Sequence, residues 1–378
     1  MKKNIESKLS SSELFPDLEA DRKYFFLVLW ILSLISYLYR ALVALNFWTY
    51  KKGFKKVTTL SVPVVSVGNL TVGGTGKTPI LIYLTNLMNL GGRRVGIVSR
   101  NYKSAVRSIV KVEPGSESDI SDGQRFGDEP LLIFQQTGVP VYVGPVKLET
   151  AKEIVRTEKI DTVFIDDGFQ HLALKKNCNI LLCDVTQMDE SNHLLPRGRY
   201  REPFEGYKKA NIIFWTKTNF VPASHLAELK KMVSFKGIQV DWKFELTKVD
   251  FPGFANLNFD VRQRLLNPGK NEFSAIRRFV LVSAIARPEY FKKIVSDLNP
   301  KCELIEKKFR DHHQYSKDDL KVILNKPINF HHFLTTEKDY TKLKDIWPVD
   351  IPLGIVKWEP RPNMDDQKLY ETITSFIH

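Results

Sequence analysis

The sequence predicts an α/β protein built on a mainly parallel sheet that has helices on both faces. Between residues 62 and 215, short runs of apolar and β-branched residues alternate with segments of helical periodicity, which is the order that a βαβ chain requires. The first run, 62–68, leads into a glycine-rich loop that opens a helical pattern. A later run ends in two acidic residues, as is typical where an open sheet binds its ligand.

The composition excludes several classes of protein. The 378 residues are 43% hydrophobic and 26% charged, the balance of a globular protein with a large core rather than of a disordered chain. Cys178, Cys183 and Cys302 have unrelated spacings, so neither a disulfide scaffold nor a paired-cysteine zinc site is expected. The formal charge of +13 indicates an anionic partner: nucleic acid, a phosphorylated substrate or an acidic membrane surface.

An apolar helix is expected near the N-terminus, over about residues 24–48. Residues 24–39 carry no charge, Arg40 interrupts the run, and a basic cluster follows at 51–56. A helix of this kind either enters a membrane or is buried in the core of the protein. Its aromatic residues and basic end favour an anionic membrane surface. The pattern leaves open whether the helix spans the bilayer or lies in the interface.

The glycine-rich loop after the first predicted strand has the composition of a phosphate-binding loop. The glycines allow backbone N–H groups to turn toward phosphate oxygens, Lys77 adds positive charge, and the hydroxyl of Thr78 can bind Mg²⁺. The match is imperfect, because Thr71 stands where the strict pattern has glycine. The predicted nucleotide-binding residues are Asn69, Gly73, Gly74, Thr75, Gly76, Lys77 and Thr78.

Other chemical groups are expected at the same edge of the sheet. Asp166 and Asp167 directly follow the predicted strand 160–165, where a sheet of this kind places metal-binding carboxylates. Asp128 precedes a helical run and can instead be the cap of that helix. Arg201 belongs to a cationic loop that either binds phosphate or is simply solvated. Further strands are expected at 94–100, 139–143, 179–184 and 211–215, and a helix at 151–159.

A smaller α/β unit is predicted after residue 245. Residues 220–245 are mixed in pattern and helical in parts, and prolines and glycines mark loops between 246 and 275. Strands are then expected at 279–284 and 330–336, and helices from Arg287 to about Leu298 and over 316–325. The predicted organisation is an N-terminal segment (1–56), a core (57–245) and a C-terminal unit (246–378).

Besides the apolar helix and the phosphate loop, five further motifs follow in order along the chain: Gly127-Asp128-Glu129-Pro130, Asp166-Asp167-Gly168-Phe169-Gln170-His171, Arg201-Glu202-Pro203, Asp311-His312-His313 and Thr336-Glu337-Lys338-Asp339. Taken in order, these motifs resemble those of the tetraacyldisaccharide 4′-kinase family, and the resemblance covers most of the chain. The family often has Arg-Gly-Tyr-Gly after the second strand, whereas this chain has Arg100-Asn101-Tyr102-Lys103.

The resemblance implies a kinase of the P-loop NTPase type at the cytoplasmic face of the inner membrane. It would transfer the γ-phosphoryl group of ATP, with Mg²⁺, to the 4′-hydroxyl of a tetraacylated glucosamine disaccharide 1-phosphate, a late step of lipid A biosynthesis. Nucleic acid is not expected as a partner, because the chain has no nucleic-acid-binding motif.

The resemblance also assigns roles to single residues. Asp128, paired with His312, would activate the sugar hydroxyl, and Lys77 would stabilise the transferred charge. Asp166 and Asp167 would handle Mg²⁺, and Asp167 would thereby take part in catalysis. The residues expected near the acceptor or the phosphates are Gln170, His171, Arg201 and Glu202.

Two other functions fit parts of the sequence. A P-loop ATPase or GTPase, acting as a switch or as a metal-delivery factor, would explain Lys77 and the paired aspartates but not the apolar helix. In that case Thr216-Lys217-Thr218-Asn219 only half resembles a guanine-reading motif. A membrane adaptor that binds nucleotide without catalysis is the other alternative. Neither protein would move phosphate to an organic hydroxyl.

Overall fold

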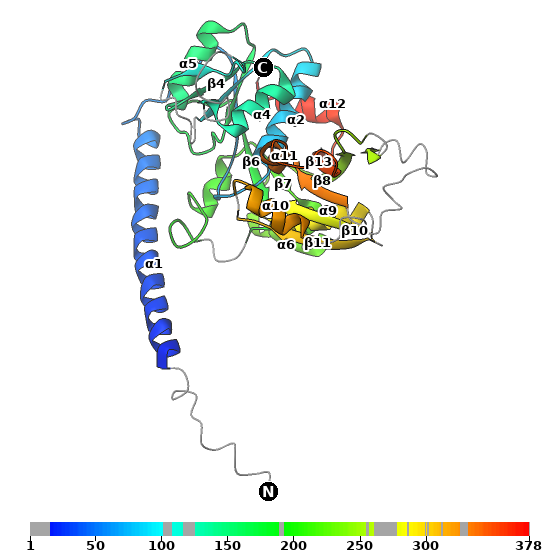
Figure 1. Cartoon of the computed structure of the whole chain (residues 1–378). Helices are drawn as coiled ribbons and strands as arrows, with labels where there is room; N and C mark the ends of the chain where they lie inside the picture. Colours follow the sequence, from blue (N-terminus) through cyan, green and yellow to red (C-terminus); the bar gives the residue numbers. More distant parts are fainter. Residues whose placement is uncertain are drawn as a thin grey trace.

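One mainly parallel sheet runs through the whole protein, as the alternation of strands and helices predicts (Figure 1). The computed structural model describes residues 16–100, 108–115, 125–188, 193–254, 257–260, 278–285, 287–298, 300, 302–310, 313–325 and 332–377. Within these residues the sheet has 13 strands, in the order β11-β10-β12-β13-β8-β7-β6-β1-β5-β2-β4-β3, and β9 pairs with β8 outside this path. The predicted fold class is confirmed.

The strands of the predicted core lie close to the expected ranges, apart from β3, which was not predicted. All of them pair in parallel except β3, which is antiparallel to β4. Their central residues are buried on both sides, as is typical of a parallel strand covered on both faces. These strands are β1 (Val64–Asn69), β2 (Val95–Arg100), β3 (Val110–Lys111), β4 (Val141–Gly144), β5 (Thr162–Asp166), β6 (Cys178–Asp184) and β7 (Ile212–Thr216).

Helices cover both faces of this part of the sheet. Alternate residues of β1 point to opposite faces, so Val65 joins the hydrophobic cluster on one side and Val64 joins the cluster on the other. On the first side lie α2 (Lys77–Leu90), α4 (Asp128–Thr137) and α12 (Asp366–Thr374). On the second side lie α5 (Lys147–Thr157) and, further along the sheet, α6 (Ala223–Val233). The short helices η1 (Phe204–Lys209) and η2 (Thr218–Phe220) complete this half.

A long antiparallel pair joins the two halves of the sheet. It consists of β8 (Ile238–Asp250) and β13 (Leu353–Pro362), and β9 (Phe259–Asp260) pairs with β8 as well. The helical part expected within 220–245 is α6, but the strand β8 is missing from the sequence-based prediction. Its signal is the alternation of Val240, Trp242 and Phe244, all of which are buried. The boundary predicted at 245 falls inside β8, so the division into 57–245 and 246–378 remains a proposal.

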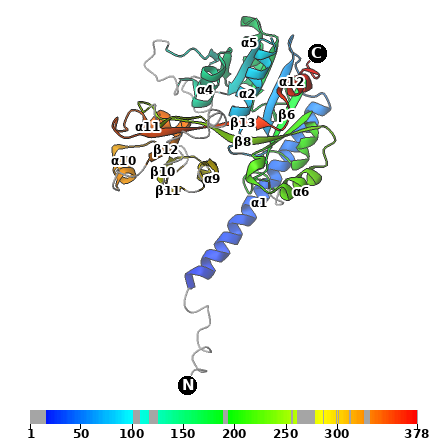
Figure 2. The same ribbon diagram turned by 90° about the vertical axis from the view of Figure 1, so that its right-hand side faces the viewer.

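The C-terminal half repeats the α/β pattern on a smaller scale (Figure 2). Its strands β10 (Arg278–Ser283), β11 (Glu303–Lys308) and β12 (His332–Thr336) pair in parallel, and β12 continues onto β13. Apolar side chains of α9 (Pro288–Leu298) pack on one face, and those of α10 (Lys317–Leu324) and α11 (Glu337–Leu343) pack on the other. A capping box between Ser316 and Asp319 begins α10, as expected for that pair of residues.

The N-terminal helix α1 (Pro16–Lys51) projects from the body of the protein (Figures 1 and 2). Its segment Phe26–Lys51 is long and apolar enough to cross a membrane, and only 6% of its most apolar window is buried. A core helix would be buried, so that alternative is not supported. The helix therefore fits a membrane anchor, as its composition predicts.

Candidate active site

The phosphate loop connects β1 to α2 and is held from outside by its neighbours. The hydroxyl of Thr216, at the end of β7, donates to the carbonyl of Thr75 (3.0 Å), and the N–H of Val72 donates to the carbonyl of Arg199 (2.8 Å). Gly76 has φ of 86°, and a Cβ there would come within 2.6 Å of the ring of Phe244. Only glycine fits that position, which explains this part of the motif.

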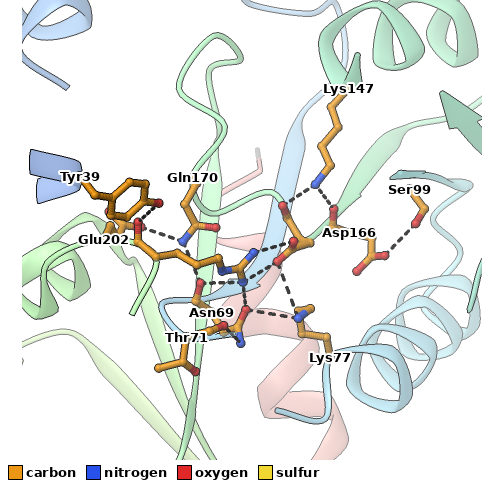
Figure 3. A network of polar contacts seen from close by, with 11 residues as sticks. Tyr39, Asn69, Thr71, Lys77, Ser99, Lys147, Asp166, Gln170 and Glu202 are labelled. Atoms are coloured by element: carbon orange, nitrogen blue, oxygen red, sulfur yellow. Dashed lines mark hydrogen bonds and ion pairs between the residues drawn. The ribbon is translucent and has the colours of Figure 1, made fainter. Parts of the chain in front are cut away.

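A network of charges lies where β1 and β5 end, beside this loop (Figure 3). Arg201 binds Asp167 with two hydrogen bonds of 2.8 and 2.9 Å, and the same guanidinium donates to the side-chain oxygen of Asn69. The ammonium of Lys77 lies 3.3 Å from Asn69 Oδ1 and 3.7 Å from Asp167 Oδ1. The structure therefore brings together four of the residues predicted for the site, from the phosphate loop, the end of β5 and the cationic loop.

Asp167 is a carboxylate held by cations. Burial by itself would raise its pKa, but the hydrogen bonds from Arg201 and the charge of Lys77 hold the pKa well below its usual range. Its backbone has φ of 50°, a left-handed conformation that is uncommon outside glycine and is often found at functional sites. Each carboxylate oxygen accepts one hydrogen bond from Arg201 and keeps a second acceptor position, so the predicted role of Asp166 and Asp167 toward Mg²⁺ stays a prediction.

Asp166 is buried, at 6% exposure, and faces the second strand of the core. It accepts a hydrogen bond from Ser99 (2.8 Å) through one oxygen, and burial raises its pKa. Lys147, at the start of α5, donates to the carbonyls of both Asp166 (2.7 Å) and Asp167 and so fixes this turn of the chain. A divalent cation would stabilise the charged form of Asp166.

The residues predicted near the acceptor form a second layer next to the network. Gln170 donates through one amide nitrogen to the carbonyl of Asn69 (2.8 Å) and to the carboxylate of Glu202 (2.8 Å), which Lys209 also binds. The Nε2 atom of His171 is buried and has no hydrogen-bond partner among the described residues. Burial and the neighbouring Lys147 lower the pKa of His171 to about 4. His171 is therefore neutral at pH 7. Its ring can donate or accept a hydrogen bond with a ligand, but it adds no charge.

The low pKa of His171 predicts that the folded protein loses stability as the pH falls. Between an unfolded pKa of about 6.5 and a folded pKa of about 4, the unfolded chain binds the proton and the folded chain does not. The stabilisation is fully present above pH 6.5 and is lost as the pH falls toward 4. Urea unfolding at pH 7 and pH 4.5 measures it. Between pH 7 and pH 4.5, the free energy of unfolding of the wild type should fall by about 2 kcal/mol more than that of His171→Gln. This is less than the full pKa shift implies, because the ring is partly solvated. If the difference in free energy of unfolding between the wild type and His171→Gln is the same at both pH values, this expectation is wrong.

The first turn of α4 presents carboxyl groups to the same edge. Asp128 is exposed and begins the helix, and no side chain caps this end, so its predicted role as a cap is not seen. Its neighbour Glu129 keeps an exposed surface. Nevertheless, desolvation by the protein around its carboxyl raises the pKa, with further contributions from Asp166 and, in the opposite sense, from Lys77 and Lys338. The first turn of α4 therefore faces the phosphate loop on one side and the C-terminal half on the other.

The C-terminal motifs are only partly described. Asp311 and His312 lie outside the described residues, so the pairing of His312 with Asp128 stays a prediction. The adjacent His313 donates or accepts a 3.0 Å hydrogen bond with Asp319. In the motif 336–339, Thr336 caps α11 and the buried Asp339 accepts the N–H of Ala284 (3.0 Å), so these two side chains fix the start of α11.

In the segment that only half resembles a guanine-reading motif, the side chains of Asn219 and Lys217 are already bound within the protein. The side-chain amide of Asn219 donates to the carbonyl of Phe244 (3.0 Å) and accepts from the N–H of the same residue (3.0 Å). Lys217 is bound to Asp184 (2.6 Å) and to the carbonyl of Gly74 (2.8 Å). Because both ends of the amide are occupied by the backbone, this geometry does not favour the GTPase alternative.

Comparison with known proteins identifies the class of this site. The model of the tetraacyldisaccharide-1-P 4′-kinase family matches residues 28–378. The chain belongs to this family. It is 33% identical to the tetraacyldisaccharide 4′-kinase of Bdellovibrio bacteriovorus over 346 residues, which cover 91% of this chain and 98% of that protein. It is 30% identical to the enzyme of that name from Flavobacterium johnsoniae, over 83% of this chain and 87% of that protein.

A solved structure of the family supports the same assignment. LpxK from Aquifex aeolicus, crystallised in complex with ATP, superposes with a TM-score of 0.66 at 26% identity, covering 91% of this chain and 98% of that one. The family and the kinase class predicted from the sequence are thereby confirmed, in preference to the switch, metal-delivery and adaptor alternatives.

Sequence reasoning missed several residues that the kinase fold brings into this site. Lys147 and Ser99 fix the turn at Asp166, and Tyr39 of α1 donates to the carbonyl of Arg201 (2.7 Å). None of these residues belongs to a recognisable motif, so the sequence offers no signal for them. Asp184 ends β6 and Lys217 directly follows β7, at the edge of the sheet where ligands bind, and that position was an available signal.

Proposed function

We propose that this chain transfers the γ-phosphoryl group of ATP to the 4′-hydroxyl of a tetraacylated disaccharide 1-phosphate at the surface of the inner membrane. Membership of the tetraacyldisaccharide-1-P 4′-kinase family supports this proposal. The single observation in the structure that carries it is the convergence of Lys77 and Arg201 on Asp167 and Asn69 at the mouth of the phosphate loop.

The phosphate loop and Lys77 bind and orient the triphosphate. Phosphoryl transfer is catalysed mainly by positioning and by neutralising charge on the transferred group. The ammonium of Lys77 is already held in place by Asn69 and Asp167, so it needs little rearrangement to meet a phosphate. Arg201 adds a second cation at the same edge, where it fixes the position of Asp167 and lies close to the incoming phosphates.

Asp128 is the proposed general base for the sugar hydroxyl. It is exposed at the first turn of α4 and has no hydrogen bond or ion pair with the described residues. A carboxylate accepts a proton from a hydroxyl that lies within about 2.6–3.2 Å. By the family resemblance, His312 assists Asp128, and Gln170, His171 and Glu202 lie near the acceptor.

The residues at the loop fit a magnesium ion that also binds phosphate. Among the described residues no cluster of three His, Cys, Asp or Glu side chains forms a metal cage. Mg²⁺ in phosphoryl-transfer sites is instead bound by one or two protein oxygens together with phosphate oxygens and water. Thr78, Asp166 and Asp167 are the residues proposed to hold it. The ion would neutralise negative charge on the phosphates.

The N-terminal helix would place this site at a membrane. Its partly buried residues lie at 29, 32, 33, 36, 39 and 43, along one stripe, whereas the other positions from 26 to 48 are exposed. On the stripe, Ser36 donates to the carbonyl of Leu194 (2.8 Å) and Tyr39 donates to that of Arg201. The stripe therefore binds the loop that carries Arg201, and the apolar remainder of the helix is available to lipid.

Charges on the lipid-facing side of α1 should release the protein from membranes. Leu38 and Leu42 are 62% and 56% exposed. Changing both to Glu is expected to shift most of the protein from the pellet to the supernatant in co-sedimentation with anionic vesicles, because a charge in the hydrocarbon costs about 2.5–3.5 kcal/mol. The matched control is Val322→Glu, at an apolar position on α10 that is 57% exposed. If the double variant still pellets, the anchor lies elsewhere.

The reaction can be tested directly against the alternative functions. Purified protein is incubated with γ-labelled ATP, Mg²⁺ and the disaccharide lipid in mixed micelles. Label in the lipid supports the kinase, whereas label in inorganic phosphate alone would show an ATPase. Binding of ATP without either product would show an adaptor.

A further inference from the structure

Lys217 is a buried lysine that contacts three separate parts of the protein. It directly follows β7, and its side chain is 10% exposed. The ammonium donates to Asp184 Oδ2 (2.6 Å) at the end of β6 and to the carbonyl of Gly74 (2.8 Å) in the phosphate loop. It also lies 5.0 Å from the centre of the Tyr290 ring in α9, which belongs to the C-terminal half. An ammonium has three protons, and these contacts occupy it fully.

Asp184 serves Lys217 and is not available to a metal. One carboxylate oxygen accepts from the N–H (3.1 Å) and the hydroxyl (2.6 Å) of Thr186, and the other accepts from Gln187 (2.8 Å) and Lys217. Its side chain is only 1% exposed. A strand-end aspartate with every acceptor position occupied acts as a fixed counterion, so the pair positions other groups instead of binding a ligand.

The contacts of Lys217 and its neighbour determine which way the phosphate loop faces. The carbonyls of Gly74 and Thr75 are held away from the nucleotide side by Lys217 and by the hydroxyl of Thr216. In a trans peptide the following N–H points opposite to the carbonyl, so the hydrogen bond from Thr216 to the carbonyl of Thr75 turns the N–H of Gly76 inward. The N–H of Thr75, which follows the carbonyl bound by Lys217, donates to the carbonyl of Gly73 (3.1 Å), so Lys217 fixes the tight turn that precedes Gly76. An inward carbonyl would repel phosphate, whereas an inward N–H binds it.

We propose that Lys217 is a positioning residue that holds the phosphate loop in its nucleotide-binding conformation and makes this conformation depend on the docking of α9 through Tyr290. The left-handed backbone of Lys217, with φ of 62°, agrees with this role, since such strain persists only where the surroundings fix it. The inference rests on the proposed binding of ATP by the loop, and it adds a residue that does not touch the nucleotide.

The test compares the binding of AMP-PNP with Mg²⁺ and the kinetics of full-length variants. Lys217→Met combined with Asp184→Asn removes the ammonium without leaving a buried charge unpaired. We expect its Kd for AMP-PNP and its KM for ATP to rise about tenfold, the effect of losing one hydrogen bond to a charged group, while the KM for the lipid acceptor stays unchanged. A purely structural defect would lower kcat through a smaller folded fraction and leave both KM values unchanged.

Two milder variants of Tyr290 test whether Lys217 positions the phosphate loop, even if the double variant does not fold. Tyr290→Leu removes the ring and should weaken AMP-PNP binding by about threefold, the effect of a cation–π contact. Tyr290→Phe loses the hydrogen bond of the hydroxyl with Thr186 but keeps the ring, and should bind AMP-PNP more tightly than Tyr290→Leu. Equal affinity of the two Tyr290 variants, or wild-type affinity in a folded double variant, would overturn the inference. Absence of AMP-PNP binding by the wild type would instead refute the proposed function.

Discussion

Replacing Lys77 with Ala is expected to lower kcat about 10²–10³-fold, the loss seen when one preorganised charge-stabilising donor is removed. The ammonium lies 3.3 Å from Asn69 Oδ1 and 3.7 Å from Asp167 Oδ1, so it is preorganised at the mouth of the loop. Arg201 still binds both oxygens of Asp167 in the variant, and the protein should therefore remain folded.

The measurement for Lys77 is the rate of label transfer from ATP to lipid at saturating substrates, together with a thermal unfolding curve. Lys152→Ala is the matched control, because Lys152 is a half-exposed lysine of α5 that pairs with Glu149 in the same helix. A Lys77→Ala variant with unchanged turnover would show that the loop does not bind the transferred phosphate.

Asp128→Asn is expected to lower kcat about 10²–10⁴-fold, the usual contribution of a general base, with little change in the KM for ATP. Asn has the size of Asp but cannot accept the proton of the sugar hydroxyl. The exposed position of Asp128 and the absence of a cap at this end of α4 mean that the substitution removes no structural contact among the described residues.

The pattern of kinetic constants decides the role of Asp128. Glu129→Gln is the control, because it changes the neighbouring carboxyl of the same helical turn and keeps Asp128 in place. If Asp128→Asn raises the KM for ATP and leaves kcat unchanged, Asp128 binds substrate or metal and is not the base. If both variants are active, the proton acceptor is another group.

The phosphate loop and the parallel sheet could be predicted because their signals are local. A strand followed by a glycine-rich loop and a helix requires only neighbouring residues, and the run 160–165 carries Asp166 and Asp167 at its end. The strand β8 was not predicted, although its apolar residues Val240, Trp242 and Phe244 alternate with polar ones and are buried. The reason is that β8 follows a helical segment and crosses the expected domain boundary. Its partner β13 lies more than a hundred residues away along the chain.

The sequence by itself determined the fold class, the position of the phosphate loop, the apolar helix and the family. Each of these depends on residue order and periodicity, which the chain carries without folding. Only the tertiary structure decided that Arg201 donates to both carboxylate oxygens of Asp167, and that Lys217 donates to the carbonyl of Gly74 in the phosphate loop. These partners come from different strand ends, and only the pairing of the strands brings their charges within hydrogen-bonding distance.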